Sequence, residues 1–183
     1  MSKWNWEQVF PEIKWIKDEC LRIQVEETYD EAMEIGGWEN LEELEKLPFL
    51  IRDPGFGGTF VGHIRFVTQL SRAIGEIAAS YLQGYTLNFD FLIAGALLHD
   101  VGKVFGFAVT PEGEYQKSQH EKFLRHCYSG AGLAMKHGLP EIVVHIIAVH
   151  APEGDLSYRC PEAVIVNKSD FLTLDTMKAA KDW

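Results

Sequence analysis

One short stretch decides what kind of fold this chain adopts: FLIAGALLHDVGK, residues 91–103. Eight residues, nearly all apolar, lead directly into His99 and Asp100, and a glycine and Lys103 follow. Such a run is typical of a helix that is buried on all sides. An unpaired carboxylate in that position is costly and tends to take up a proton. The interior of the protein must therefore hold something that compensates the charge of Asp100.

The composition is that of an ordinary globular protein. The chain has 183 residues, 46% of them hydrophobic and 24% charged, and can bury a core in one domain without disulfides or a structural metal. Its three cysteines, Cys20, Cys127 and Cys160, are far apart and form no CxxC pair, which favours reduced thiols and a cytoplasmic location. The N-terminus, MSKWNWEQVF, lacks the apolar core of a signal peptide, and FLIAGALL is too short to span a bilayer. We expect no membrane association.

The charge argues against polynucleotide ligands. The net charge is −10 and the pI is near 5.1. A surface of this sign repels nucleic acid. The excess of acidic residues lies before residue 60, in runs that are best explained as solvated helix faces. We therefore expect a small-molecule substrate and no nucleic-acid partner.

Residues 1–60 are interpreted as a helical extension in front of a main domain formed by residues 61–183. Apolar spacing predicts one helix over residues 4–34 and a short one over 38–47. The glycine-rich segment 52–58 is interpreted as a turn, or alternatively as a lid through which Arg52 reaches the substrate. Four tryptophans of the extension are expected to pack it onto the main domain, and a homodimer contact is the alternative; they are Trp4, Trp6, Trp15 and Trp38.

The main domain is predicted to be nearly all α-helical. Periodicity and breaks place its helices at residues 62–77, 89–100, 119–137, 141–150 and 162–178. Residues 104–118 interrupt this pattern around a Thr-Pro-Glu-Gly turn, which predicts a small hairpin or mobile flap. Residues 151–161 are predicted to be a loop.

Five separate segments direct a histidine or an aspartate inward, four of them from an apolar helix and the one with His126 from just before the small-residue run SGAGLA, where a neighbouring helix can approach closely. They carry His63, His99 with Asp100, His126, His150 and Asp170. The first begins a stripe that continues through Val67, Leu70, Ile74 and Ile77. A lone histidine on such a face is usually a hydrogen-bonded core residue, but five such segments in one chain indicate a shared ligand. A pair of divalent cations would accept the imidazole lone pairs and neutralise the carboxylates, with one carboxylate bridging.

The ordered set resembles the HD-domain superfamily of metal-dependent phosphohydrolases, from about Gly62 to Leu174. LLHDVGK (97–103) is similar to the central motif of that family, and HCYSGA (126–131) to its later HxxxGA element. IIAVH (146–150) resembles the segment with the fourth histidine, and VNKSD (166–170) the segment with the closing aspartate. The resemblance implies an all-α bundle of five or more helices with a central metal site.

His126 and His150 are additional to His63 and to the His99–Asp100 pair. With them the chain resembles the subgroup of this family that holds two metals. By this resemblance Asp100 bridges both ions. His63, His99 and Asp170 complete one site, and His126 and His150 complete the other. Iron or manganese is implied, with cobalt, nickel or zinc as alternatives. The three remaining histidines match no family position and are interpreted as structural or exposed; they are His120, His137 and His145.

The expected reaction is hydrolysis of a small phosphoester, with a nucleotide as the favoured substrate. Two metals activate a bridging water, orient it and offset charge on the phosphoryl oxygens. Asp100 and Lys103 are the predicted catalytic residues. Lys103 would bind a phosphate oxygen, or alternatively would only cap the end of its helix. Arg159 and Lys168 are further candidates for substrate binding.

Two segments are predicted to set specificity, the flap at 104–118 and the loop at 151–161. In the flap, Phe105, Phe107 and Tyr115 would line a pocket for a base or another apolar group. His150 is followed by APEGD rather than by a GYP motif, which argues against hydrolysis of a cyclic dinucleotide.

Two alternative functions stay open on the sequence. The same ligand set resembles mixed-valent di-iron oxygenases of the superfamily, which cleave C–C or C–P bonds with O₂. A non-catalytic binding module with a decayed site is the other alternative, although no ligand position is lost.

Overall fold

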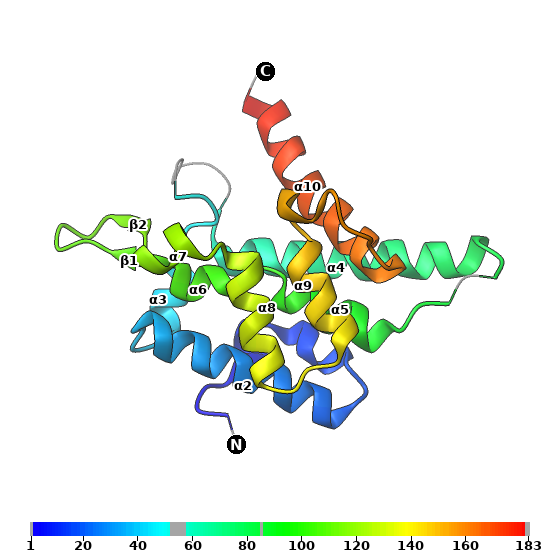
Figure 1. Cartoon of the computed structure of the whole chain (residues 1–183), viewed down its shortest axis with the longest axis horizontal. Coiled ribbons are helices and arrows are strands. Elements are labelled where there is room, and N and C mark those ends of the chain that lie inside the picture. The colour runs from blue at the N-terminus through cyan, green and yellow to red at the C-terminus, as the bar shows by residue number, and fades with distance from the viewer. Residues whose placement is uncertain (1, 52–57, 85, 182–183) are drawn as a thin grey trace.

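The computed structural model describes residues 2–51, 58–84 and 86–181, and shows a helical protein with one small hairpin (Figure 1). The turn or lid predicted for residues 52–58, including Arg52, lies almost entirely outside the described residues. The elements are α1 (Trp6–Val9), η1 (Pro11–Trp15), α2 (Glu19–Gly36), α3 (Leu41–Lys46), α4 (Phe60–Tyr81), α5 (Phe89–Leu98), α6 (Gly102–Gly106), β1 (Phe107–Val109), β2 (Tyr115–Lys117), α7 (Gln119–Phe123), α8 (His126–Lys136), α9 (Glu141–Val149), η2 (Pro152–Gly154) and α10 (Pro161–Lys181). The all-α fold class is confirmed.

Helix α5 occupies the centre of the molecule. It packs against α2, α4, α9 and α10, and every residue from Leu92 to Leu98 is buried. Its start is set by Asn88, whose side-chain oxygen accepts a hydrogen bond from the Phe91 amide at 3.2 Å. Gly95 lies against Ile146 of α9, where a Cβ atom would come within 2.6 Å of that side chain. The apolar run therefore forms the buried helix that the sequence predicted.

The prediction of a single helix over residues 4–34 is wrong. The chain forms α1, the 3₁₀ helix η1 and α2 in that region. Pro11 begins η1, because a proline has no amide hydrogen to continue the preceding helix but fits a first turn. Asp18 then starts α2, where its side chain accepts hydrogen bonds from the amides of Cys20 and Leu21.

The N-terminal helices share one hydrophobic core with the helices that follow them. Trp6 and Trp38 are buried in that core, while Trp4 and Trp15 are partly buried against it. The Trp38 indole also donates a hydrogen bond to the Val104 carbonyl at 2.6 Å. The tryptophans therefore pack the N-terminal helices onto the rest of the chain, as predicted. The homodimer contact stays a prediction.

The interruption predicted at residues 104–118 contains a hairpin, and the hairpin is confirmed. Strands β1 and β2 pair antiparallel, with Phe107 opposite Lys117, and the hairpin projects from one end of the molecule (Figure 1). It is preceded by the short helix α6, which the sequence did not predict. Phe105 and Phe107 are buried in the main core, and Tyr115 packs partly buried against it. The first two therefore stabilise the fold rather than line an open pocket.

The prediction of one helix over residues 119–137 is also wrong. Helix α7 ends at Phe123, Leu124 is extended with φ −132° and ψ 100°, and α8 begins at His126. The extended residue turns the chain, so that His126 enters the interior from the first turn of α8.

The apolar stripe of α4 is buried only in its first half. His63 and Val67 are buried, but Ile77 is 62% exposed. Figure 1 shows the reason: the C-terminal end of α4 runs beyond the helices packed on it. The stripe shares one helix face but faces the core only along its first half.

Candidate metal centre

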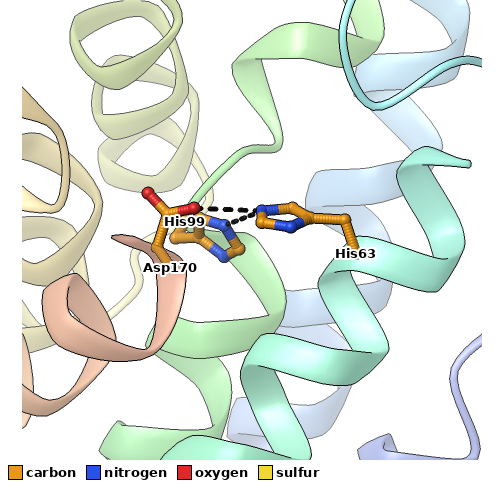
Figure 2. A group of neighbouring side chains, drawn as sticks. All are labelled: His63, His99 and Asp170. Carbon is orange, nitrogen blue, oxygen red and sulfur yellow. Dashed lines mark hydrogen bonds and ion pairs between the residues drawn. The ribbon is translucent and has the colours of Figure 1, made fainter. Parts of the chain in front are cut away.

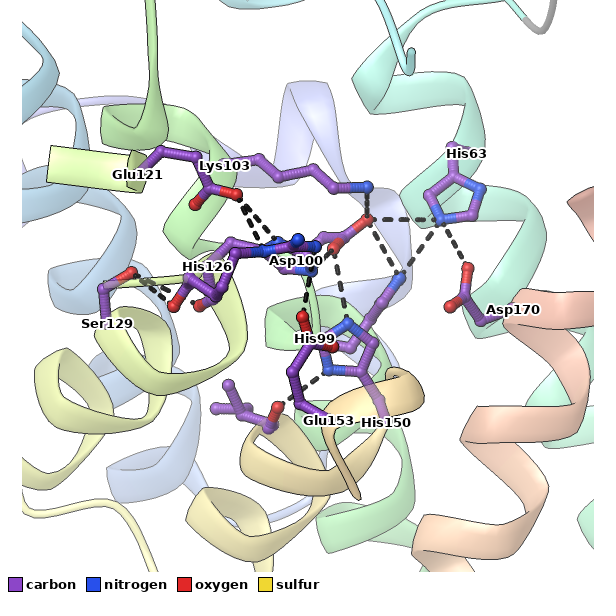
Figure 3. Close-up of polar contacts among 12 residues, drawn as sticks. His63, His99, Asp100, Lys103, Glu121, His126, Ser129, His150, Glu153 and Asp170 are labelled. Carbon is purple, nitrogen blue, oxygen red and sulfur yellow. Dashed lines mark hydrogen bonds and ion pairs between the residues drawn. The ribbon is translucent and has the colours of Figure 1, made fainter. Parts of the chain in front are cut away.

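Six predicted ligand side chains lie together in the middle of the bundle (Figure 3). Five of them come from the end or the first turn of a helix and Asp170 comes from the middle of α10, and as whole residues none is more than 8% exposed. They are His63 of α4, His99 and Asp100 after α5, His126 of α8, His150 after α9, and Asp170 of α10. Five segments that are far apart in the sequence therefore converge on one buried point.

His63, His99 and Asp170 form the first group of possible ligands (Figure 2). The Nε2 atoms of His63 and His99 are 3.1 Å apart. The same His63 nitrogen lies 3.2 Å from Oδ1 of Asp170. The second group consists of Asp100, His126 and His150, and within each group the ligand atoms lie within 4.8 Å of one another.

Asp100 lies between the two groups and presents one oxygen to each (Figure 3). Its Oδ2 atom is 3.4 Å from Nε2 of His63 and 3.5 Å from Nε2 of His99. Its Oδ1 atom is 3.2 Å from Nε2 of His126 and 3.4 Å from Nε2 of His150. A carboxylate that bridges two cations needs this arrangement, with one oxygen directed to each.

The hydrogen bonds around the imidazoles define which nitrogen is free. Nδ1 of His99 lies 2.6 Å from the Ala96 carbonyl, and Nδ1 of His150 lies 2.7 Å from the Ile147 carbonyl. A carbonyl only accepts, so each Nδ1 carries the hydrogen and a neutral ring presents its Nε2 lone pair to the centre. Oδ1 of Asp100 is buried and has no hydrogen-bond partner among the described residues. Converging lone pairs and an unsatisfied carboxylate oxygen fit a metal cation.

The charge balance of the cluster favours ionised aspartates. Burial opposes ionisation of Asp100, but the nearby Lys103 ammonium counters it, and the pKa of Asp100 lies well below its usual value. Burial also opposes ionisation of Asp170, and the contact with His63 lowers its pKa. Burial lowers the pKa of His126. The arrangement therefore favours two carboxylates and a neutral His126, the forms that bind a metal.

Of the three predicted substrate-binding cations, only Lys103 reaches the cluster. Its Nζ atom lies 2.6 Å from Oδ2 of Asp100 rather than on a helix-end carbonyl. Arg159 instead donates to the carbonyls of Val149 and Ala151, at 2.8 and 3.1 Å, and pairs with Asp155.

The hydrogen bonds and the ion pair of Arg159 hold the 151–161 loop against the end of α9. Lys168 is exposed on α10 and lies two residues from Asp170, on a different side of the helix. The structure therefore does not bring Arg159 and Lys168 to the cluster.

The three remaining histidines lie elsewhere, as predicted. His120 is exposed, and its ring forms a T-shaped contact with that of Phe105. His137 pairs with Glu31 at 2.8 Å. His145 accepts a hydrogen bond from the Cys160 amide at 3.2 Å.

Glu121 is a neighbour of the cluster that the sequence analysis missed. It is only 2% exposed, and its Oε1 atom lies 3.6 Å from Nδ1 of His126. The same oxygen pairs with Lys117 at 3.3 Å and with Arg125 at 3.2 Å. Burial opposes ionisation of Glu121, but His126 and Lys117 outweigh it and lower its pKa. The spacing of Glu121 and Arg125, four residues apart, was the available signal, but it is equally typical of a solvated helix face.

Phe49 is a second neighbour that the sequence analysis missed. Its ring stacks on that of His63, with the centroids 3.7 Å apart. The side chain is 1% exposed and belongs to the segment between α3 and α4. No periodicity surrounds Phe49, so nothing in the sequence connects it with His63.

The chain belongs to the HD-domain family, because residues 60–175 match the family model described as HD domain. It is 29% identical over 119 residues to a dihydroneopterin 2′,3′-cyclic phosphate phosphodiesterase of Methanocaldococcus jannaschii. That alignment covers 63% of this chain and 46% of the relative.

A second relative is a ribonuclease Y of Pseudothermotoga lettingae, which is 25% identical over 171 residues. The alignment covers 82% of this chain and 28% of the ribonuclease. The chain thus spans less than half the length of either relative. No solved structure matches it. Among the helices of the described residues, none has the length and apolar character needed to cross a membrane.

Proposed function

We propose that this protein is a metal-dependent phosphohydrolase acting on a small phosphoester, with a nucleotide as the favoured substrate. The observation that carries the proposal is Asp100, which directs one oxygen to each of two groups of buried imidazoles. The names of both relatives describe enzymes that break phosphodiester bonds. Membership of the HD-domain family supports the same chemistry.

The proposed ligands are the six clustered side chains. His63, His99 and Asp170 would hold one ion, His126 and His150 the other, and Asp100 both. Imidazole and carboxylate ligands without a thiolate suit iron, manganese, cobalt, nickel or zinc, and we propose iron or manganese. When bound, such a pair supplies an activated water and offsets charge on a phosphoryl group.

The protein's own residues would arrange the substrate around this pair. Among the six clustered side chains and Lys103, the most accessible are Lys103, at 14%, and Asp170, at 11%. The side chain of Asp100 is only 1% accessible. A phosphate group would therefore approach from the side of Lys103 and Asp170. There the Lys103 ammonium would bind a phosphate oxygen as a point charge while its contact holds Asp100 in the ionised form.

Metal counting on matched variants tests the ligand assignment. We expect two equivalents of iron or manganese per wild-type chain and a loss of metal in Asp100→Ala. Asp175→Ala is the matched control, because this exposed aspartate lies on the same helix as Asp170 and pairs only with Lys178 at 3.7 Å among the described residues. Full metal content in Asp100→Ala would contradict the assignment.

Activity measurements separate hydrolysis from the oxygenase alternative. We expect the manganese-loaded protein to hydrolyse bis(p-nitrophenyl) phosphate and nucleoside 2′,3′-cyclic phosphates in the absence of O₂. Lys103→Ala should lower this rate without removing the metal. Consumption of O₂ by the iron-loaded protein, with no phosphoester hydrolysed anaerobically, would favour the di-iron oxygenase instead.

A further inference from the structure

Phe49 precedes the part of the chain that matches the HD-domain family, yet it touches the candidate metal centre. Its position is fixed by backbone pairing with the start of α4. The Phe49 amide donates to the Gly58 carbonyl at 3.1 Å, and the Phe60 amide donates to the Leu47 carbonyl at 2.7 Å. Pro48 and Thr59 form the antiparallel bridge between them. The segment is thus attached to the first turns of the helix that carries His63.

The stacking of Phe49 on His63 is close and nearly parallel. The ring centroids are 3.7 Å apart and the planes are inclined by 21°. Both side chains are buried, so the contact excludes water from one face of the imidazole. Any rotation of the His63 ring away from Asp170 would have to displace the Phe49 ring, which is itself packed in the interior.

His63 differs from the other three histidines of the cluster in the surroundings of its Nδ1 atom, the ring nitrogen that points away from the centre. His99 and His150 each donate from Nδ1 to a backbone carbonyl, and Nδ1 of His126 faces Glu121. Nδ1 of His63 is buried and has no hydrogen-bond partner among the described residues. A metal-binding histidine is usually oriented by a hydrogen bond from that nitrogen. At His63 the aromatic contact takes this place.

Phe49 also contacts the proposed catalytic cation. Nζ of Lys103 lies 4.8 Å from the centroid of the Phe49 ring, a distance typical of a cation–π contact. The same ammonium reaches Oδ2 of Asp100. One apolar ring therefore lies against both the ligand His63 and the cation Lys103.

We propose that Phe49 is a positioning residue of the metal centre. It holds His63 in the orientation that binds the first ion and keeps Lys103 beside Asp100. The segment around Phe49, which lies outside the family-matched region, thereby completes the site. This inference rests on the proposed function, since it assigns Phe49 a role toward the metal.

Metal affinity measured by chelator competition tests the proposal. Phe49→Leu keeps an apolar side chain but removes the ring, and should weaken one of the two ions about 10- to 100-fold, the range typical of lost support around a ligand. The other ion, held by His126 and His150, should bind as in the wild type. Phe10→Leu is the matched control, because Phe10 is another fully buried phenylalanine of the N-terminal region, and its ring stacks on Trp6 rather than on a candidate ligand.

A second measurement needs no metal. In the metal-free protein, the ring current of Phe49 should shift the His63 ring protons in the NMR spectrum, and Phe49→Leu should abolish this shift while Phe10→Leu preserves it. If the wild type binds two ions and Phe49→Leu binds both unchanged, the positioning role is refuted and the proposed function survives. If the wild type binds no metal, both the positioning role and the proposed function are refuted. An unchanged His63 spectrum in Phe49→Leu would refute the contact itself.

Discussion

Replacing Gly102 with alanine should push α6, which begins two residues after Asp100, away from His126 at the start of α8. A Cβ atom on Gly102 would lie 2.2 Å from the His126 carbonyl oxygen and 2.8 Å from its carbonyl carbon. Ordinary van der Waals contact begins at 3.4 Å, so the two backbones must move apart by up to 1.2 Å. Both contacts are with backbone atoms, and no side chain can rotate to relieve them.

The expected cost follows from this displacement. Overpacking a well-packed interior typically costs about 1–3 kcal/mol, and we expect a value near the upper end because the backbone must move. His126 would shift relative to Asp100, whereas metal–ligand distances tolerate only about 0.2 Å. The ion that we propose for Asp100, His126 and His150 should therefore be lost or bind at least about tenfold more weakly.

Urea unfolding and metal analysis test this prediction together. Gly132→Ala is the matched control, because Gly132 lies in the same helix as His126 and a Cβ atom there would meet nothing within 4 Å. Since alanine favours a helix by up to about 1 kcal/mol over glycine, the control should be as stable as the wild type or more stable. A Gly102→Ala protein with unchanged stability and full metal content would refute the reasoning.

Three further predictions concern stability. Tyr29→Phe should lower the free energy of unfolding by about 1–2 kcal/mol, because the Tyr29 hydroxyl donates to the buried Leu97 carbonyl at 2.5 Å; an unchanged urea midpoint would contradict this. The Lys136 ammonium, and then His137, lowers the pKa of Glu31 in the folded protein from the value of 4.5 that it has in the unfolded chain. Ionised Glu31 therefore stabilises the fold above pH 4.5, and this contribution is lost as the pH falls through the lowered pKa. The stability difference between the wild type and Glu31→Gln should therefore shrink below that pH, and a difference that grew on acidification would reverse the sign of the argument. Removal of metal with a chelator should lower the melting temperature, and added manganese should restore it.

The candidate ligands could be predicted because most of them stand out against their own helices. His63, His150 and Asp170 share apolar faces with core residues, and Asp100 ends a run of buried residues. A buried polar side chain is costly unless it is paired, and five such segments in one chain indicated a shared ligand. The order and spacing of the motifs then identified the HD-domain family, which the family match confirms.

Helix ends and surface contacts were predicted less well. Pro11 and Leu124 interrupt regions whose apolar spacing is continuous, and the stripe of α4 continues to Ile77 although that residue is exposed. Spacing records which residues are apolar, but not where the neighbouring helices end. Arg159 and Lys168 were placed near the cluster by sequence proximity alone, and their side chains point to loop carbonyls and to solvent.

The sequence by itself determined the helical class, the buried central helix and the identity of the six candidate ligands, because these depend on local periodicity and on the cost of burying polar groups. Tertiary structure alone decided that Asp100 lies between two histidine pairs, that Phe49 stacks on His63 and that Glu121 lies beside His126. Those contacts join segments whose relative placement depends on packing across the whole core. No local pattern specifies such a distance, since it results from all the helices packing together.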